Sequence, residues 1–163
     1  MDFQSKLLDL QRKLKSKKET TFVTIYGSYT SPIKEILQEI RDALKSEGYA
    51  AGLVEDYPNN TGSHELNPDQ KSLFYIDCSN VNILYFFKNT DNQSVSREAN
   101  YILDNPHLIG TAIFFEEKEP HEEFGAIKSL LSTRLLAKNI RTTPFNRSNA
   151  TKLTKKALID FIY

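Results

Sequence analysis

Short apolar runs alternate with amphipathic stretches along most of this chain. Four of the runs, rich in β-branched and aromatic residues, predict strands at 21–26, 49–54, 81–87 and 111–115. A more polar stretch at 140–145 predicts a fifth strand at an edge of the sheet. The run at 81–87 has the sequence VNILYFF and is the most apolar, so we expect it to be a central strand that is buried on both faces.

Between these runs, apolar residues recur three or four positions apart, which is typical of amphipathic helices. In the helix after the first strand, Ser31 is placed to cap the N-terminus and Pro32 to occupy the first helical position. This helix would bury a stripe of apolar residues, namely Ile33, Ile36, Leu37, Ile40 and Leu44. Further helices are expected at 68–77 and 94–105, and around two more apolar stripes: Phe124, Ile127, Leu130, Leu131 and Leu135, then Leu153, Ala157, Leu158, Phe161 and Ile162.

A separate helix is expected at the start of the chain. One helical face is marked there by apolar residues at 4-3-4 steps, namely Phe3, Leu7, Leu10 and Leu14. The lysine-rich stretch 13–18 suits the C-terminal end of a helix, where positive charge complements the helix dipole. We therefore expect residues 1–18 to form a leading helix that packs on the domain or on a partner, and residues 19–163 to form a single α/β domain.

Strands and helices alternate through most of the chain, which is the pattern of a parallel sheet covered on both faces. We predict an α/β, flavodoxin-like, doubly wound fold with a five-stranded parallel sheet in the order 2-1-3-4-5, preceded by the N-terminal helix. In that order the chain reverses direction between strands one and three, and ligands bind in the crevice at the C-terminal ends of these strands. Functional residues are therefore expected in the loops that follow them.

The composition excludes some classes of function. The 21 Lys and Arg residues balance the 21 Asp and Glu residues, so the chain lacks the overall basic field that drives non-specific nucleic-acid binding. The single cysteine, Cys78, is expected to be a buried structural thiol in a reducing compartment. The three histidines share no metal-ligand spacing, so no metal is expected. No run approaches the ~20 apolar residues of a membrane span, so we expect a cytoplasmic protein.

Polar side chains gather at the predicted crevice. The joint after strand one, 26–31, and the loop after strand three, 88–94, should lie side by side. The residues expected to face one another there are Gly27, Ser28, Tyr29, Thr30, Asp91, Ser94 and Glu98, with Asp56 and Glu116 flanking them. The joint lacks the glycine-lysine-serine/threonine run of a phosphate-binding loop and the G-x-G-x-x-G of a dinucleotide site. It is either a tight turn or a ligand contact at a helix start.

Glu98 lies one turn into the helix after the central strand. A helix N-terminus stabilises a carboxylate at this position, and this alone explains an acidic residue there. The functional alternative is an ionised carboxylate that attacks the anomeric carbon of a sugar or stabilises an oxocarbenium ion. Tyr29 and Tyr57 either stack on a base near the crevice or pack structurally. Arg97 either contacts a phosphate or pairs with a nearby acid.

Three short motifs, IYGSY at 25–29, DCSNVNILYFF at 77–87 and SREANYI at 96–102, make the chain similar to nucleoside 2-deoxyribosyltransferases and their relatives. It resembles especially the uncharacterised archaeal members of that superfamily, over most of 21–145. TIR-type NAD-cleaving domains share the flavodoxin-like architecture and also place a glutamate after a central strand. The resemblance implies chemistry at the N-glycosidic bond of a nucleoside, a nucleotide or NAD, with no cofactor.

The resemblance also implies roles for single residues. Glu98 matches the glutamate nucleophile of the family, and Tyr26 lies near the position of a tyrosine that orients it. Gly27 fills the glycine position of the turn, and Asp91 is adjacent to the position of a family aspartate. In the same interpretation Ser28, Asp56 and Asp91 hold sugar hydroxyls or the base.

Several positions depart from the family pattern. Ser28 stands where a proline is common, and Asn80 and Asn92 stand where the family has aspartate. Two functions therefore remain open. The first is an enzyme that cleaves or transfers at an N-glycosidic bond, in which Tyr26 or Tyr29 fixes Glu98. The residues around its substrate would be Gly27, Ser28, Tyr29, Asp56, Tyr57 and Ser94. The second is a non-catalytic nucleotide-binding or protein-interaction module on the same fold. Either form could be a homo-oligomer.

Overall fold

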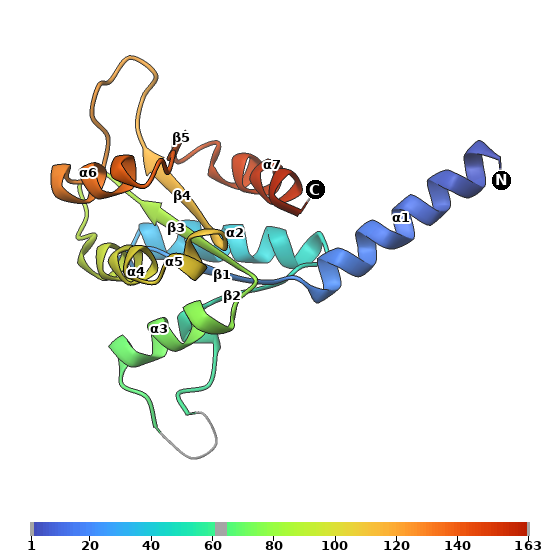
Figure 1. Cartoon of the computed structure of the whole chain (residues 1–163), viewed down its shortest axis with the longest axis horizontal. Coiled ribbons are helices and arrows are strands. Elements are labelled where there is room, and N and C mark those ends of the chain that lie inside the picture. Colours follow the sequence, from blue (N-terminus) through green and yellow to red (C-terminus); the bar gives the residue numbers. More distant parts are fainter. Residues whose placement is uncertain (1, 61–64, 163) are drawn as a thin grey trace.

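The computed structural model describes residues 2–60 and 65–162, and its sheet consists of five parallel strands (Figure 1). The strands lie in the order β2-β1-β3-β4-β5. Their bounds are β1 Phe22–Tyr26, β2 Ala50–Leu53, β3 Val81–Phe86, β4 Ala112–Glu117 and β5 Thr143–Phe145. The doubly wound, flavodoxin-like strand order expected from the sequence is confirmed.

The strand at the centre of the sheet is β3, and all six of its residues are buried. It pairs with β1, where Ile83 lies opposite Ile25, and with β4, where Ile83 lies opposite Ile113. On the far side of β1, Leu53 of β2 lies opposite Ile25. Because the strands are parallel, the C-terminal ends of β1, β2 and β3 meet at one edge of the sheet, and the loops that follow them lie together.

Helices cover both faces of the sheet. On one face, α2 (Ile33–Ser46) and α7 (Ala150–Ile162) contribute the fully buried Leu37 and Leu158 to the core. The other face carries a second core that includes Val95 and Leu131. The helices on or beside this face are α3 Pro68–Cys78, α4 Gln93–Asp104, α5 Pro106–Ile109 and α6 Ser129–Ala137, and a 3₁₀ turn, η1 Val54–Asp56, follows β2.

The start of α2 differs from the prediction. The helix begins at Ile33, so Pro32 precedes it rather than occupying its first position. The Ser31 hydroxyl does not cap a backbone N–H but donates a hydrogen bond of 2.6 Å to Oε1 of Glu35. The predicted apolar stripe is largely confirmed, because Ile33, Leu37, Ile40 and Leu44 are buried, and Ile36 packs against the same core.

Two further predictions are wrong. The helix expected around 124–135 begins only at Ser129, and Phe124 and Leu130 are 77% and 79% exposed. The thiol of Cys78 is exposed, not buried, because Cys78 is the last residue of α3 and lies beyond its buried residues Tyr75 and Ile76.

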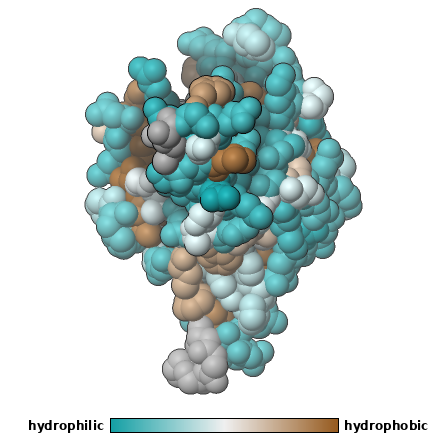
Figure 2. All heavy atoms as spheres, turned by 90° about the vertical axis from the view of Figure 1, so that its right-hand side faces the viewer, coloured by the Kyte–Doolittle hydropathy of each residue, from teal (hydrophilic) through white to brown (hydrophobic). Residues whose placement is uncertain are grey.

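The N-terminal helix α1 extends from Phe3 to Thr20 and projects away from the sheet (Figure 1). It has no buried residue along its length. Its C-terminal end contacts the body of the protein, where Lys18 forms an ion pair of 3.3 Å with Glu47 and its ammonium lies over the Tyr49 ring. Figure 2, which faces the end of the molecule from which α1 projects, shows apolar side chains scattered among a majority of hydrophilic ones.

The polar segment 59–67 lies between η1 and α3, and a bridge joins Asn60 to Glu65 within it. The polar, turn-rich sequence of 59–67 predicts a mobile loop, but its residues Gly62, Ser63 and His64 lie outside the described residues. Among the helices of the described residues, none has the combination of length and apolar character needed to cross a bilayer.

Candidate functional site

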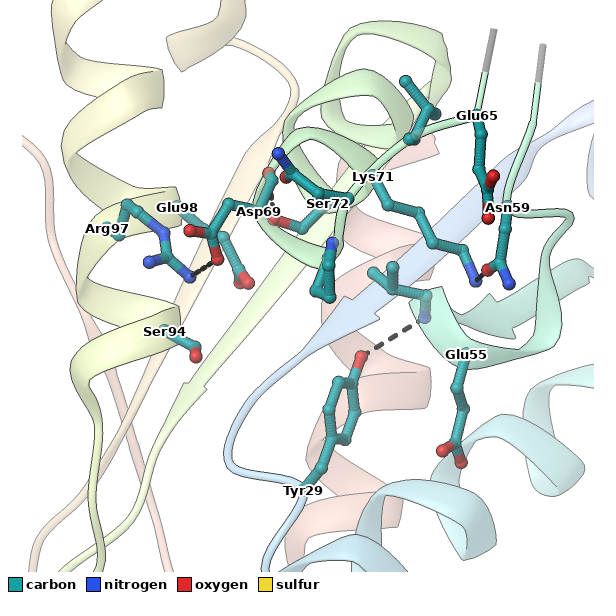
Figure 3. Close-up of a pocket in the computed structure, with 14 residues that line it drawn as sticks. Tyr29, Glu55, Asn59, Glu65, Asp69, Lys71, Ser72, Ser94, Arg97 and Glu98 are labelled. Carbon is teal, nitrogen blue, oxygen red and sulfur yellow. Dashed lines mark hydrogen bonds and ion pairs between the residues drawn. The ribbon is translucent and has the colours of Figure 1, made fainter.

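A cavity of about 700 Å³ lies at the edge of the sheet where β1, β2 and β3 end. Its walls come from the loop after β1, from η1, from the start of α3 and from the first turns of α4 (Figure 3). We call it the Glu98 cavity. It is lined by Tyr29, Val54, Glu55, Asn59, Glu65, Leu66, Asn67, Pro68, Asp69, Lys71, Ser72, Ser94, Arg97 and Glu98. The crevice that the strand order predicts is thus present as a defined space.

Glu98 is buried in the wall of this cavity, with only 5% of its surface exposed. It projects from the face of α4 that also buries Val95, Ala99 and Ile102 against the sheet, and this packing fixes the helix. Within the described residues, its Oε2 atom is buried without a hydrogen-bond partner. A buried polar atom without a partner lowers the stability of the fold by about 1–3 kcal/mol. A hydrogen bond between this oxygen and a ligand would remove that cost.

The protonation of Glu98 follows from this burial. Removal from water raises the pKa of Glu98 to about 8, while the positive charge of Arg97 and the hydroxyl of Ser72 lower it to a smaller extent. The side chain therefore keeps its proton at neutral pH. This differs from the ionised carboxylate that the sequence suggests, because a helix N-terminus and one neighbouring guanidinium do not offset the loss of solvation.

Opposite Glu98, Lys71 reaches from α3 toward Asn59 (Figure 3). Lys71 is only 8% exposed, and its ammonium group donates a hydrogen bond of 2.8 Å to Oδ1 of Asn59. Ser72 is also buried, and its hydroxyl donates to the carbonyl oxygen of Asp69 at 3.2 Å. The cavity therefore contains a buried acid from α4 and a buried cation from α3.

Two ion pairs lie on the rim of the cavity. Arg97 contacts Asp69 at 2.9 Å and so joins α4 to the first turn of α3. Glu55 contacts Lys34 at 3.1 Å and so joins η1 to α2. Arg97 thus pairs with an acid, which is one of the two roles expected from the sequence. It also lines the cavity.

Tyr29 forms the floor of the cavity as drawn in Figure 3. Its hydroxyl accepts a hydrogen bond of 3.2 Å from the backbone N–H of Val54. Burial of the hydroxyl end and the charge of Glu98 raise the pKa of Tyr29 above its ordinary value, so the phenol stays neutral. Ser94, in the first turn of α4, lines the same space. The structure thus brings together three residues that the sequence suggests: Tyr29, Ser94 and Glu98.

Tyr26 lies nearby but does not contact the Glu98 carboxyl group through a hydrogen bond. Its hydroxyl donates to Oδ1 of Asn82 at 2.9 Å, and the Asn82 amide in turn donates to the carbonyl oxygen of Ile76 and to the Thr111 hydroxyl. Burial, and secondarily the charge of Glu98, raise the pKa of Tyr26 well above its ordinary value. Tyr26 therefore belongs to a buried network in the sheet rather than to the lining of the cavity.

The turn after β1 is occupied by internal contacts. A Cβ atom at Gly27 would lie 3.0 Å from Cδ1 of Leu37, so the residue type is explained by the close approach of α2. The hydroxyl of Ser28 is buried and accepts hydrogen bonds from the Thr30 N–H at 3.3 Å and the Thr90 hydroxyl at 3.2 Å. Neither Gly27 nor Ser28 lines the Glu98 cavity.

Asp56 is likewise engaged within the fold. Its carboxylate accepts two hydrogen bonds from the Arg41 guanidinium, at 2.9 and 3.0 Å, and one of 2.8 Å from the Leu53 N–H. It therefore ties η1 to the end of β2 and to α2, and it does not line the cavity.

Tyr57 packs as a structural aromatic residue. Its ring centroid lies 5.2 Å from that of Phe22 and 4.5 Å from that of Tyr75. Its hydroxyl lies 3.2 Å from the Thr24 hydroxyl, which places it over the sheet and outside the cavity lining. Of the two tyrosines suggested as stacking partners for a base, only Tyr29 faces the cavity.

Asp91 accepts a hydrogen bond of 2.9 Å from the Gln93 N–H and so stabilises the turn before α4. It does not line the cavity. Asn80 and Asn92, which stand where the resembled family has aspartate, bind backbone atoms: Asn80 accepts from the Phe22 N–H and Asn92 donates to the Phe87 carbonyl. Glu116 accepts from the Ile127 N–H at 2.8 Å and lines a different cavity.

Most lining residues are not suggested by the sequence, among them the polar residues Asn59, Lys71 and Ser72. A signal for Lys71 exists, because it lies four positions before Tyr75 and so shares the helical face that Tyr75 buries. Among the described residues there is no cluster of three or more His, Cys, Asp or Glu side chains that could hold a metal ion.

A scan against models of protein families found no match, and a search of curated proteins found none either. Among solved structures, a cysteine-to-serine mutant of flavodoxin from Pseudomonas aeruginosa is similar to this chain, at 12% sequence identity. The similarity covers 88% of this chain and 97% of that chain, with a TM-score of 0.49. This is a distant likeness of fold, from which nothing follows about a ligand.

Proposed function

We propose that this protein cleaves or transfers at the N-glycosidic bond of a nucleoside, a nucleotide or NAD, with Glu98 as the catalytic residue. The observation that supports the proposal is a carboxyl group buried in the wall of a cavity, with one oxygen that has no partner among the described residues. The residue pattern that resembles nucleoside 2-deoxyribosyltransferases is centred on the same glutamate.

The protonated state of Glu98 defines the first step. As the bond between the anomeric carbon and the base nitrogen breaks, its electron pair goes to the base, and Glu98 donates its proton to the base. The sugar is left as an oxocarbenium ion, and the carboxylate formed at that moment lies beside it. Attraction between the two charges in a buried site stabilises the transition state.

The second step returns the enzyme to its starting state. The Glu98 carboxylate either bonds to the anomeric carbon, giving a glycosyl ester, or removes a proton from a water molecule that adds to that carbon. The nitrogen of a second base displaces the ester, and the N–H proton of that base passes to the released carboxylate. The first route is transfer and the second is hydrolysis. Tyr29 and Ser94 present hydroxyl groups to the same space, where they hydrogen-bond sugar or base. No step requires a metal or a cofactor.

The test is the release of free base from nucleosides, deoxynucleosides, nucleoside monophosphates and NAD, followed by chromatography. The wild-type protein should release a base from at least one of them, and Glu98→Gln should lower the rate by roughly 10²–10⁴-fold, the usual contribution of a general acid. The matched control is Glu39→Gln, on the exposed surface of α2, which should leave the rate unchanged. Unchanged turnover in a folded Glu98→Gln protein would remove Glu98 from the mechanism.

A second candidate is a non-catalytic module that binds a nucleotide in the same cavity. One observation favours it: Tyr26, the residue expected to orient the glutamate, donates its hydroxyl to Asn82 instead. In that case no base is released, but one compound of the panel raises the thermal stability of the protein. Saturation at ~100 times the dissociation constant adds about 2.7 kcal/mol to the free energy of unfolding.

A further inference from the structure

Lys71 provides a charge that the chemistry at Glu98 does not use. Lys71 is only 8% exposed, and its side chain points into the Glu98 cavity toward Asn59 (Figure 3). In the part of the chain that the structure describes, the polar partner of its ammonium group is the neutral amide oxygen of Asn59, at 2.8 Å. Burying an ammonium group without an opposite charge is unfavourable.

The position of Lys71 in its helix adds to this cost. It is the fourth residue of α3, an eleven-residue helix that begins at Pro68. The N-terminal end of a helix carries partial positive charge and favours an anion rather than a cation. The first turns of α3 and α4 both line the cavity, so two positive helix ends and one buried ammonium group act on the same space.

The acidic side chains of the lining do not balance Lys71. Asp69 is paired with Arg97, and Glu55 is paired with Lys34. Glu65 lies beside Asn59, at the end of the cavity that Lys71 reaches (Figure 3), but it is exposed to solvent, which screens its charge. Glu98 projects from α4, across the cavity from the end of the Lys71 side chain (Figure 3). Among the described residues, Lys71 therefore has no carboxylate within ion-pair distance, and it lines a cavity that a ligand can enter.

We propose that Lys71 binds an anionic phosphate group of the ligand, so that the cavity prefers nucleoside 5′-phosphates to the corresponding nucleosides. This inference rests on the proposed function in taking the ligand to be a nucleotide, and it adds the group by which the ligand is selected. Asn59 orients the ammonium group, and the phosphate oxygens accept charge-assisted hydrogen bonds from it. The sugar then lies between Lys71 and Glu98.

The experiment measures affinities by titration calorimetry for matched pairs of nucleosides and their 5′-monophosphates. The wild-type protein should bind at least one monophosphate about tenfold or more tightly than its nucleoside, the usual effect of one hydrogen bond to a charged group. Lys71→Met should reduce that preference to below about threefold, and Lys71→Arg, which keeps the charge, should retain most of it. The matched control is Lys45→Met, which removes a lysine on the exposed surface of α2, outside the cavity lining, and should leave the preference unchanged.

Equal affinity for nucleoside and monophosphate in the wild-type protein would overturn the inference, as would an unchanged preference in a folded Lys71→Met protein. The wild-type comparison needs no variant, so it decides the matter even if Lys71→Met fails to fold.

An arm with inorganic pyrophosphate separates this inference from the proposed function. Base release from nucleosides and monophosphates at equal efficiency keeps the function and removes the role of Lys71. Lys71-dependent binding of pyrophosphate, with no nucleotide bound, keeps the anion site and removes the function. If neither pyrophosphate nor any nucleotide binds, both the proposed function and the role of Lys71 are wrong.

Discussion

Two regions at the same edge of the sheet contain polar residues of similar type but use them differently. In the turn after β1 and the loop after β3, Ser28, Thr90 and Asp91 take part in hydrogen bonds within the fold. In the Glu98 cavity, which the first turns of α3 and α4 line, Glu98 has a buried oxygen without a partner, and the partner of Lys71 is a neutral amide oxygen, among the described residues. The first region holds the loops together, although Oδ1 of Asn92 in it is also buried without a partner among the described residues. In the second region Glu98 and Lys71 line one cavity, and we propose that a ligand completes their hydrogen bonds.

The difference shows what a polar residue at a sheet edge does and does not indicate. Nearly all buried polar groups in folded proteins have hydrogen-bond partners, so a polar side chain at the right place is as easily structural as functional. The informative feature is a buried polar or charged group whose partners fall short. Glu98 and Lys71 meet this criterion, whereas Asp56 and Tyr57 do not.

The largest difference between the two regions is expected in the pH dependence of stability. The pKa of Glu98 is about 8 in the folded protein, against an ordinary value of 4.5, so between these two pH values the folded state binds more protons than the unfolded state. The free energy of unfolding should therefore fall as pH rises from about 4.5 to about 8, by on the order of 1.4 kcal/mol for each unit of pKa difference. Denaturant unfolding between about pH 5 and pH 9 measures it.

The variant Glu98→Gln isolates this contribution, because the amide cannot ionise. It should lose this part of the pH dependence and be more stable than the wild-type protein above about pH 8. Glu39→Gln, on the exposed surface of α2, serves as the control and should keep the wild-type slope. If the free energy of unfolding depends on pH equally in the wild-type protein and in Glu98→Gln, Glu98 is not a buried, uncompensated carboxyl group.

The next largest effect is expected at Tyr26. Tyr26→Phe removes the hydroxyl that donates to Asn82, leaving a buried amide oxygen without that donor. The free energy of unfolding should fall by about 1–3 kcal/mol, while the rate of base release stays within about twofold of wild type. Chemical denaturation and the chromatographic assay measure the two quantities on the same sample. A large loss of turnover with unchanged stability would restore Tyr26 to the role that the family resemblance implies.

A smaller effect is expected at Asp56. Asp56→Asn weakens the pair with Arg41 and the hydrogen bond from the Leu53 N–H, so the protein should lose about 1 kcal/mol of stability. Ligand affinity should not change, because Asp56 lies outside the cavity lining. Thermal unfolding and calorimetry test these expectations. A tenfold loss of ligand affinity would show that Asp56 takes part in ligand binding.

The smallest effect is expected at Asp91. Asp91→Ala removes one exposed hydrogen bond to the Gln93 N–H, and its effect on stability should be within about 0.5 kcal/mol. Base release should be unchanged. If Asp91→Ala abolishes release while the protein remains folded, the loop after β3 takes part in catalysis and the contrast between the two regions disappears.

The sheet could be predicted from the sequence because its signals are local and strong. The run 81–87 is the most apolar of the predicted strands, and this predicts its central place in the sheet. The limits of α6 were harder to predict, because Phe124 and Ile127 continue the helical spacing although they precede the helix. Cys78 follows apolar residues, yet its exposure depends on where α3 ends against the sheet.

The site was predicted in part. The strand order places Glu98, Tyr29 and Ser94 at one edge, and all three line one cavity. Lys71 was missed because a lysine in a helix usually extends into water, and its burial depends on the packing of residues 54–59 and 65–67 around α3. The protonation of Glu98 could not be predicted either, because it depends on how completely the surrounding helices exclude water.

A carbon-13 NMR titration of the side-chain carboxyl group of Glu98 tests most directly whether an uncompensated acid lies in the cavity wall. The Glu98 resonance is assigned by its absence from the Glu98→Gln spectrum. In the ligand-free protein we expect the resonance to titrate with a midpoint near pH 8, which follows from its burial. A midpoint near 4.5, as for an exposed glutamate, would contradict the buried, protonated acid on which the cavity chemistry depends.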